Sequence, residues 1–242
     1  MIPLLRADQI DVILFDVDGT LFDRDRAQRE TCRALTETFG NLFAHIDPGI
    51  IMDAFLESDT EATRRYDAGG GVEVSRIGRI SHFLSLLGID TEYAYEMNRV
   101  YIKRYPLANV PIDGAGDTVA RLARRFRLGV VSNGIPDVQY QKLITLGLDR
   151  FMQCTVLSEE LGIRKPDARI FERALADLQT DAAQSLYVGD SYSRDIVGAK
   201  KAGMGAIWFN PGHDSVPEND TKPDHIVHTL AEIPDLLGIN NE

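Results

Sequence analysis

The sequence has few cysteines and no long apolar run. Among its 242 residues only Cys32 and Cys154 are cysteines, and their separation matches none of the paired spacings of zinc or redox sites. We therefore expect two reduced thiols and no disulfide framework, which is usual for a cytoplasmic protein. No stretch of about 18 apolar residues occurs, and residues 1–12 contain Arg6 and Asp8, so we expect neither a membrane span nor a cleaved leader.

Positive charge is also scarce. The chain has 26 lysines and arginines against 37 aspartates and glutamates, which gives a net charge of −11. Because the phosphates of nucleic acids and anionic lipids repel a strongly acidic protein, we expect neither nucleic acid nor a membrane as a partner. A small anionic substrate remains compatible with this charge, since a local site can be positive.

Short apolar runs separated by amphipathic helical patterns occupy most of the chain. The expected strands are Val12–Phe15, Leu128–Ser132, Cys154–Leu157, Leu186–Val188, Ala206–Phe209 and His225–Val227. The expected helices between and after them are Gly116–Phe126, Pro136–Leu146, Asp167–Leu178, Ser193–Ala202 and Leu230–Leu237. This alternation predicts an α/β fold with a doubly wound parallel sheet that carries helices on both faces.

One segment interrupts the alternation, since no strand pattern occurs between Arg24 and about Tyr105. Helical periodicity recurs there instead, over Arg24–Phe39, Pro48–Leu56, Glu61–Tyr66, Ser75–Leu87 and Thr91–Tyr105. We therefore expect a core domain formed by residues 1–22 and 106–242, and an all-helical domain over residues 23–105. The glycine-rich stretch Asp67–Gly71 follows no strand and precedes no GK[ST] pattern, so we interpret it as a loop of this domain.

Polar residues follow each of the first four expected strands. They are Asp16 and Asp18 after the first strand, Ser132, Asn133 and Gly134 after the second, Lys165 after the third, and Asp190 and Asp195 after the fourth. Ligands of a doubly wound sheet bind beyond the carboxyl ends of its strands. If the strands are adjacent, four carboxylates, a lysine and a hydroxyl converge at one edge of the sheet.

Four carboxylates in one place repel each other unless a cation neutralises them. Oxygen ligands without histidine or cysteine favour Mg²⁺, which keeps several waters and often bridges to a phosphate. Lys165 adds positive charge, and the hydroxyl and backbone N–H groups of residues 132–134 are suited to phosphate oxygens. The pattern therefore predicts a phosphoryl-transfer site in which one aspartate attacks phosphorus and its neighbour moves the proton.

The stretches FDVDGT, VSNG, the lysine of KPD, and GDSYSRD resemble, in this order, the four motifs of the haloacid dehalogenase (HAD) superfamily. The resemblance extends from Ile10 to about Phe209, and the helical insert resembles the helical-bundle cap of the phosphatase branch. It implies a Rossmann-like core and a Mg²⁺-dependent phosphomonoesterase. The implied substrate is a small soluble organic phosphate, such as a nucleotide or sugar phosphate, and the implied intermediate is a phosphoaspartate.

The resemblance also implies roles for the matching residues. Asp16 matches the nucleophile, Asp18 the general acid/base, and Thr20 the residue that orients Asp18. Ser132, Asn133 and Gly134 match the phosphate-binding residues, and Lys165 matches the lysine that neutralises the nucleophile and the phosphate. Asp190 matches the direct metal ligand, and Asp195 matches the carboxylate that supports the metal. The implied metal site comprises Asp16, the backbone carbonyl of Asp18, Asp190 and Asp195.

Two other activities of this superfamily fit the sequence poorly. Its dehalogenases lack the second aspartate, which is present here as Asp18. Its phosphonate hydrolases use a lysine of the cap, whereas Lys103, the one lysine in this insert, does not match that pattern. Two alternatives remain: a phosphomutase acting on a sugar phosphate, and a non-catalytic module that binds phosphate. The intact catalytic set argues against the second alternative.

Residues of the helical insert are candidates for substrate recognition. Its basic residues are almost all arginines, whose planar guanidinium groups pair well with carboxylate or phosphate. Exposed helix faces are the simpler interpretation for any one of them. The specificity candidates are Phe22, Asp23, Arg64, Arg65, Arg76 and Arg79. The expected partner is a small phosphorylated metabolite, and the sequence is compatible with either a monomer or a homodimer.

Overall fold

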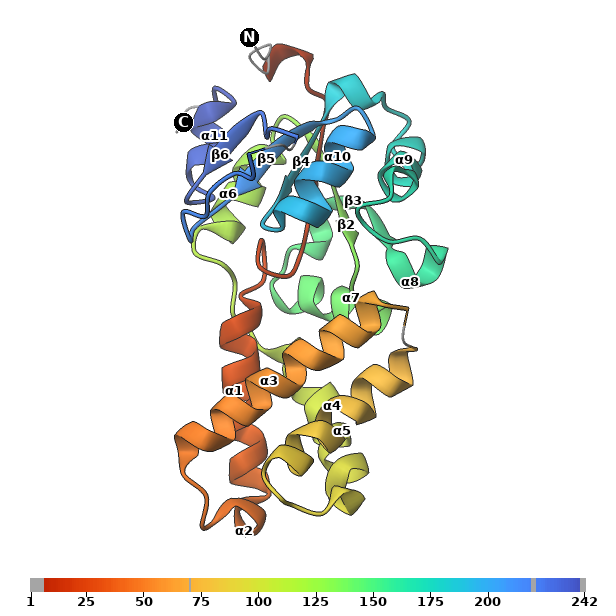
Figure 1. Ribbon diagram of the computed structural model, residues 1–242. Helices are drawn as coiled ribbons and strands as arrows, with labels where there is room; N and C mark the ends of the chain where they lie inside the picture. The colour runs from red at the N-terminus through yellow and green to blue at the C-terminus, as the bar shows by residue number, and fades with distance from the viewer. Residues whose placement is uncertain (1–6, 70, 219–220, 240–242) are drawn as a thin grey trace. The chain divides into compact units, whose positions relative to one another are not determined.

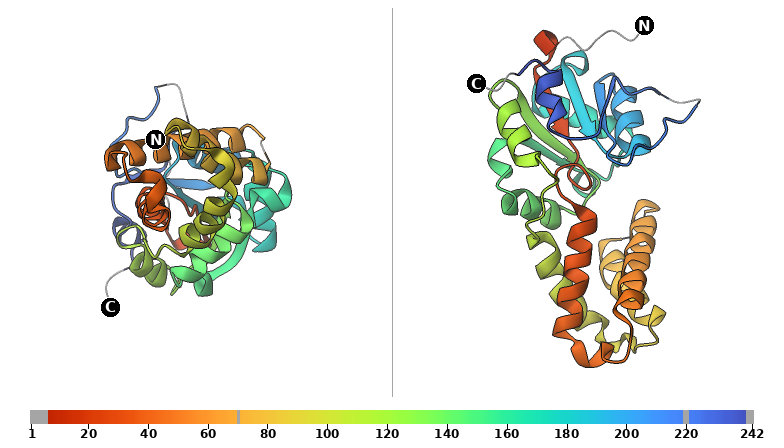
Figure 2. Two further views of the ribbon diagram at one scale, coloured as in Figure 1. Left: turned by 90° about the horizontal axis from the view of Figure 1, so that it is seen from below. Right: turned by 90° about the vertical axis from the view of Figure 1, so that its left-hand side faces the viewer.

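The computed structural model describes residues 7–69, 71–218 and 221–239. The chain divides into two compact units: Met1–Asp23 together with Val110–Glu242, and Arg24–Asn109 (Figures 1 and 2). Gly70 of the glycine-rich stretch and residues 1–6 of the N-terminal segment lie outside the described residues. Over the part of the chain that is described, no helix has both the length and the apolar character of a membrane span.

The first unit contains a parallel sheet of six strands in the order β3-β2-β1-β4-β5-β6. The strands are β1 (Val12–Phe15), β2 (Arg127–Ser132), β3 (Met152–Leu157), β4 (Ser185–Gly189), β5 (Gly205–Phe209) and β6 (His225–Val227). All four residues of β1 are buried, which explains the unbroken apolar composition of this central strand. The predicted α/β fold with a parallel sheet is confirmed, with several strands slightly longer than expected.

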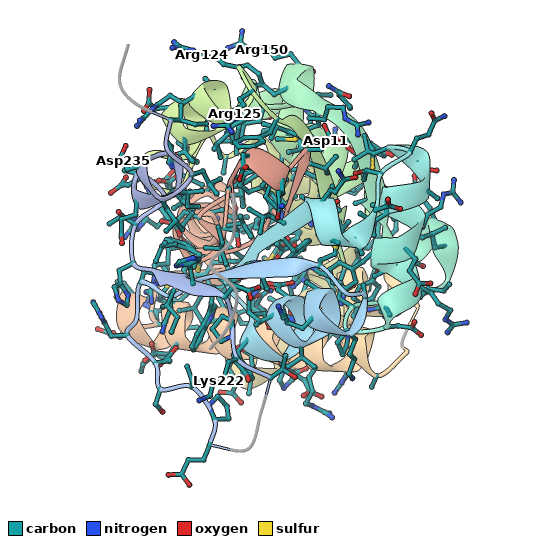
Figure 3. The ribbon with its side chains drawn as sticks, turned by 90° about the horizontal axis from the view of Figure 1, so that it is seen from above. Asp11, Arg124, Arg125, Arg150, Lys222 and Asp235 are labelled. Atoms are coloured by element: carbon teal, nitrogen blue, oxygen red, sulfur yellow. The ribbon has the colours of Figure 1, made fainter. Side chains whose placement is uncertain are left out.

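Helices cover both faces of this sheet, because the strand order proceeds from β1 in both directions and right-handed crossovers in opposite directions place their helices on opposite faces. Figure 3 shows α9 and α10 on one side of the strands and α6 on the other. The helices of this unit are α6 (Ala115–Leu122), α7 (Pro136–Thr145), α8 (Ser158–Leu161), α9 (Ala168–Asp177), α10 (Val197–Lys201) and α11 (Glu232–Leu236), with short 3₁₀ turns at Ala7–Gln9, Asp149–Phe151 and Ala182–Gln184. Val12 and Leu14 pack with Phe171 on the α9 side, since alternate residues of a strand face the same way.

The helix expected over Ser193–Ala202 is divided in the structure. A π-helical turn over Tyr192–Ile196 precedes α10, and the short helix α8 was not expected. A π-helical turn is wider than an α-helical turn and is frequent at functional sites. Here the wide turn carries Asp195.

The second unit is helical throughout its described residues. It contains α1 (Arg24–Thr38), α2 (Gly40–Phe43), α3 (Pro48–Asp67), α4 (Val72–Leu86) and α5 (Ala94–Arg104), with 3₁₀ turns at Thr91–Tyr93 and Tyr105–Leu107. Its core is aromatic: Phe83 stacks on Phe43 and meets Phe55 edge-on, with centroid distances of 5.8 and 5.3 Å. This confirms the predicted all-helical character of the insert, although α2 was not expected.

The expectation of two helices over Pro48–Leu56 and Glu61–Tyr66 was wrong, because α3 runs unbroken through residues 57–60. Ser and Thr weaken a helix when their hydroxyls compete for backbone groups. Here Ser58 and Thr60 instead donate to the carbonyls of Phe55 and Leu56, at 2.8 and 2.9 Å, inside the helix. Asp59 is buried and paired with Arg24, so a tertiary contact also stabilises this segment.

Candidate active site at the carboxyl ends of the strands

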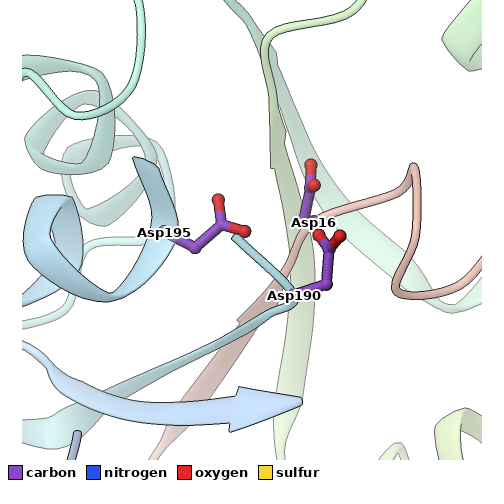
Figure 4. Close-up of side chains that lie close together, drawn as sticks. All are labelled: Asp16, Asp190 and Asp195. Carbon is purple, nitrogen blue, oxygen red and sulfur yellow. The ribbon is translucent and has the colours of Figure 1, made fainter. Parts of the chain in front are cut away.

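Three aspartates meet at the carboxyl ends of β1 and β4, which are neighbours in the sheet. Asp16 follows β1, Asp190 follows β4, and Asp195 lies in the π-helical turn. One carboxylate oxygen from each residue lies within 4.8 Å of the other two (Figure 4). The structure thus brings together three of the four carboxylates that the sequence indicated.

Two glycines make room for these carboxylates. A Cβ atom on Gly19 would lie 2.4 Å from Asp190 Oδ2, and the φ of +81° at Gly19 also disfavours other residues. A Cβ atom on Gly189 would lie 2.4 Å from Asp195 Oδ2. Both glycines of the DGT and GDS segments are therefore required by close packing against the aspartates.

The ammonium group of Lys165 lies between two of the aspartates. Lys165 Nζ is 2.8 Å from Asp16 Oδ1 and 2.7 Å from Asp195 Oδ1, and its side chain is almost fully buried. It also donates to the hydroxyl of Tyr187 at 2.9 Å, and that hydroxyl in turn donates to the Val131 carbonyl at 2.7 Å. Two ion pairs and one hydrogen bond thus surround the ammonium group, and the two carboxylates favour its charged form.

The phosphate-binding candidates also hold the segment that carries Lys165. The side-chain amide of Asn133 donates to the Lys165 carbonyl at 3.1 Å and accepts from the Lys165 N–H at 2.8 Å. Ser132 is buried, and its Oγ accepts from the N–H of Gly134 at 3.2 Å. The side-chain amide of Asn133 is therefore engaged with the backbone of Lys165, and phosphate binding by residues 132–134 stays a prediction.

Burial and mutual repulsion raise the pKa values of two of the aspartates. Burial raises the pKa of Asp16 to about 6, the attraction of Lys165 opposes this, and the charges of Asp195 and Asp18 add to the increase. Burial and the charges of Asp16 and Asp195 raise the pKa of Asp190 to about 7. Burial alone would lower the pKa of Lys165, but attraction by Asp16 and Asp195 outweighs it and the pKa lies above its ordinary value.

This donor set fits a hard divalent cation. Three carboxylates compete for one lysine, and the raised pKa values mean that the cluster lacks positive charge. Its ligand atoms are all oxygens, which suits Mg²⁺ and not a soft metal. Asp16, Asp190 and Asp195 are therefore the side chains that would hold the ion.

The carboxylate of Asp18 lies outside this group of three. Its Oδ1 is 2.5 Å from Lys142 Nζ, and its Oδ2 accepts from Gln139 Nε2 at 2.7 Å. The hydroxyl of Thr20 is 3.5 Å from Asp190 Oδ1, a long contact, and a role of Thr20 in orienting Asp18 stays a prediction. A contribution of the Asp18 carbonyl to a metal site stays a prediction.

Three residues beside the site were missed by the sequence analysis: Gln139, Lys142 and Tyr187. Gln139 and Lys142 both lie on the buried face of α7, and Tyr187 lies in β4, where it resembles any core aromatic residue. The available signal for Gln139 and Lys142 was their spacing, since two polar residues three apart lie together on the inward face of the helix. Nothing in the sequence distinguishes Tyr187 from a packing residue.

The specificity candidates have varied surroundings. Arg64 and Arg65 are exposed and pair with Glu61, whereas Arg79 is largely buried, with its Nε 3.0 Å from Asp59 Oδ1. Arg76 is partly exposed on α4, and Asp23 donates its N–H to the Val110 carbonyl at 2.9 Å. The ring of Phe22 is fully buried, with Lys142 Nζ 4.5 Å from its centroid. A contact of any of these residues with substrate stays a prediction.

Comparison with known proteins identifies the family of the chain. Residues 10–203 match the model of the haloacid dehalogenase-like hydrolases. A glyceraldehyde 3-phosphate phosphatase of Methanopyrus kandleri is 30% identical over 94% of this chain and 97% of its own. A pyrimidine 5'-nucleotidase of Escherichia coli is 27% identical over 94% of this chain and 97% of its own. A crystal structure of a putative HAD-hydrolase of Bacillus subtilis bound to magnesium superimposes with a TM-score of 0.82 at 26% identity, covering 95% of this chain and 99% of that one.

Proposed function

This chain belongs to the haloacid dehalogenase-like hydrolases, and we propose that within this family it is a Mg²⁺-dependent phosphomonoesterase acting on a small phosphorylated metabolite. The observation that supports this most is the cluster of Asp16, Asp190 and Asp195, with Lys165 paired to two of its members. Bound there, Mg²⁺ would withdraw charge from the phosphate and screen the carboxylates from it.

In the first step, a carboxylate oxygen of Asp16 attacks the substrate phosphorus and forms an O–P bond. The bond from phosphorus to the ester oxygen breaks, and that oxygen takes a proton from Asp18 as it leaves. Lys165, already paired with Asp16, reduces the repulsion between the nucleophile and the phosphate. The Ser132 hydroxyl, which accepts from the Gly134 N–H, and the backbone N–H of Asn133 would hold the phosphate oxygens.

In the second step, the phosphoaspartate is hydrolysed. Asp18, now a carboxylate, takes a proton from a water molecule whose oxygen attacks phosphorus. The O–P bond to Asp16 breaks, inorganic phosphate leaves, and Asp18 is again protonated for the next leaving group. The 25% exposure of the Asp18 side chain is compatible with access by both an alcohol and water.

The helical unit, Arg24–Asn109, is the proposed cap, and its closure would exclude bulk water during the first step. A phosphorylated metabolite as substrate agrees with the names of the relatives, which are phosphatases of glyceraldehyde 3-phosphate and of pyrimidine nucleotides. Because such metabolites occur inside cells, and Cys32 and Cys154 are free thiols, we propose a cytoplasmic location.

The first experiment is a measurement of phosphate release from a panel of phosphomonoesters, with Mg²⁺ and with EDTA. The panel contains glyceraldehyde 3-phosphate, pyrimidine 5'-monophosphates and hexose phosphates. Metal-dependent release is the expected result, and one strongly preferred compound would identify the substrate. Isomerisation of a hexose phosphate without phosphate release would instead support the phosphomutase alternative. The absence of both reactions would contradict an enzymatic role.

Asp16→Asn tests the nucleophile. We expect kcat to fall by more than about 10⁴-fold, since loss of a nucleophile removes the covalent route entirely. The matched control is Asp11→Asn, because Asp11 immediately precedes β1 and pairs with Arg127 away from the cluster. Turnover by Asp16→Asn close to that of the control would refute the assignment.

A further inference from the structure

Lys142 is a buried cation in a helix that would otherwise be expected to bury apolar residues. Only 1% of its side chain is exposed, because it lies on the inward face of α7 beside Gln139, which is equally buried. Burying a lysine and a glutamine costs free energy unless both find partners. The partner that they share is Asp18, the proposed general acid/base, so contacts with Asp18 offset the cost of burying these two side chains.

Gln139 and Lys142 together hold both oxygens of the Asp18 carboxylate. Lys142 Nζ is 2.5 Å from Oδ1, and Gln139 Nε2 is 2.7 Å from Oδ2. Residues three apart in a helix lie on the same face, so two side chains of α7 reach the two oxygens at once. Two contacts on different oxygens restrict rotation of the carboxylate about its Cβ–Cγ bond, which one contact would not do.

The surroundings keep both side chains in this arrangement. A Cβ atom on Gly134 would lie 1.7 Å from Gln139 Nε2, so the glycine of the SNG segment leaves the space that the amide occupies. The ring of Phe22 lies below the Lys142 ammonium at 4.5 Å, a favourable cation–π distance. Gln139 Oε1 is buried and has no hydrogen-bond partner among the described residues, so the bond to Asp18 is what orients this amide.

The two contacts leave part of the Asp18 side chain accessible. The Asp18 side chain is 25% exposed, against 1% for Lys142. The same carboxyl group must face the leaving oxygen in the first step and a water molecule in the second. A fixed orientation therefore serves both proton transfers without a search among rotamers.

We infer that Lys142 and Gln139 are positioning residues that fix the carboxyl group of Asp18 for proton transfer to the leaving group and from water. This inference rests on the proposed function, in which Asp18 is the general acid/base. It predicts that loss of either residue impairs proton transfer selectively, while phosphate binding and attack by Asp16 persist.

The test compares phenyl phosphate with p-nitrophenyl phosphate, two aryl esters of similar size. Phenolate leaves far more readily with a proton, whereas p-nitrophenolate leaves without one. The value of kcat/KM reports the steps up to phosphoenzyme formation. For Lys142→Met and Gln139→Leu, we expect kcat/KM to fall about 10- to 100-fold for phenyl phosphate and less than about 3-fold for p-nitrophenyl phosphate, as a displaced catalytic group predicts.

Two further variants make the outcome decisive. Asp18→Asn should show the same selective loss in larger measure, whereas Lys200→Met, which removes a lysine–aspartate pair of 2.7 Å elsewhere in the first unit, should change neither ester. Equal losses on both esters, or no loss, in both Lys142→Met and Gln139→Leu would overturn the inference. If Asp18→Asn itself lost activity on both esters equally, the role of Asp18 in the proposed function would fail as well.

Discussion

Asp16 and Asp190 hold their protons more tightly in the folded protein than in the unfolded chain, because burial raises their pKa values to about 6 and about 7. Protons bound more tightly by the folded state stabilise it at low pH. Without metal, the contribution of these two groups is complete below about pH 4, the unfolded value, and is lost as the pH rises through 6 and 7. The cluster then carries its full negative charge.

Mg²⁺ should reverse this loss, so its effect should depend on pH. At pH 8 we expect a Mg²⁺ concentration about 100 times the Kd at that pH to raise Tm by about 5–10 °C, and the same concentration is used at pH 5. At pH 5 the increase should be less than half as large, because protons compete with the metal for Asp16 and Asp190. Differential scanning calorimetry with Mg²⁺ or EDTA measures both values. Equal increases at the two pH values, or an undiminished increase in Asp190→Asn, would contradict binding at this cluster.

Tyr187→Phe removes one hydroxyl that both Lys165 and the Val131 carbonyl use. Since two buried partners lose a hydrogen bond, we expect the free energy of unfolding to fall by about 1–3 kcal/mol. With Lys165 less restrained, kcat should fall up to about 10-fold while KM changes little.

Tyr140→Phe is the matched control for this change. Tyr140 is 41% exposed, and its hydroxyl makes only a 3.5 Å contact with Glu160. In urea unfolding and steady-state kinetics, the control should therefore keep the free energy of unfolding, the kcat and the KM of the unchanged protein. If Tyr187→Phe behaved like the control, its hydroxyl would have no role in holding Lys165.

The sequence indicated the clustered site residues because motif residues at the ends of adjacent parallel strands must meet. Asp16, Asp190 and Lys165 are of this kind. Lys142 and Tyr187 were missed for a physical reason: a lysine and a tyrosine are usually exposed or simply packed. The contacts of Lys142 depend on how α7 lies against the loop of residues 16–22, and those of Tyr187 on how β4 lies against β2 and the segment that carries Lys165. Local sequence pattern specifies neither arrangement.

At the scale of elements, the strands were predictable because buried parallel strands are short, apolar and bounded by turn residues. Boundaries within helices were less predictable, since tertiary contacts outweighed local propensity. Asp59 illustrates this in α3, where pairing with Arg24 and Gln28 keeps a Ser-Asp-Thr segment helical. The π-helical turn over Tyr192–Ile196 likewise depends on Asp195, whose Oδ2 accepts from the Ser191 N–H at 2.9 Å.

Two helical glycines should respond in opposite ways to alanine. A Cβ atom on Gly116 in α6 has no neighbour within 4 Å, so Gly116→Ala should raise the free energy of unfolding by about 0.5–1 kcal/mol. A Cβ atom on Gly198 in α10 would lie 2.6 Å from Phe171 Cε2, so Gly198→Ala should lower it by about 1–3 kcal/mol. Urea unfolding measures both, and destabilisation by Gly116→Ala would contradict the open surroundings of α6.

At the scale of the whole molecule, each unit has its own core and its own buried ionic group. The first unit has the carboxylate cluster with Lys165, and the second has Asp59, whose carboxylate contacts Arg24 at 2.6 Å, Gln28 at 2.8 Å and Arg79 at 3.0 Å. The partners of these two buried ionic groups therefore belong to the same unit as the group itself. We expect local perturbations to act mainly within the unit that contains them.

Hydrogen exchange measured by mass spectrometry tests this expectation in the full chain. Asp59→Asn deprives two arginines of their carboxylate and should lower the stability of the helical unit by about 3–5 kcal/mol. Peptides of residues 24–109 should then exchange faster, while β1, β2 and β4 keep their protection. Mg²⁺ should do the converse, slowing exchange around Asp16, Asp190 and Asp195.

The matched control is Glu61→Gln, which removes only exposed pairs with Arg64 and Arg65 and should change little. Faster exchange across both units in Asp59→Asn would mean that they unfold together, since the loss of one ionic group would then destabilise both cores.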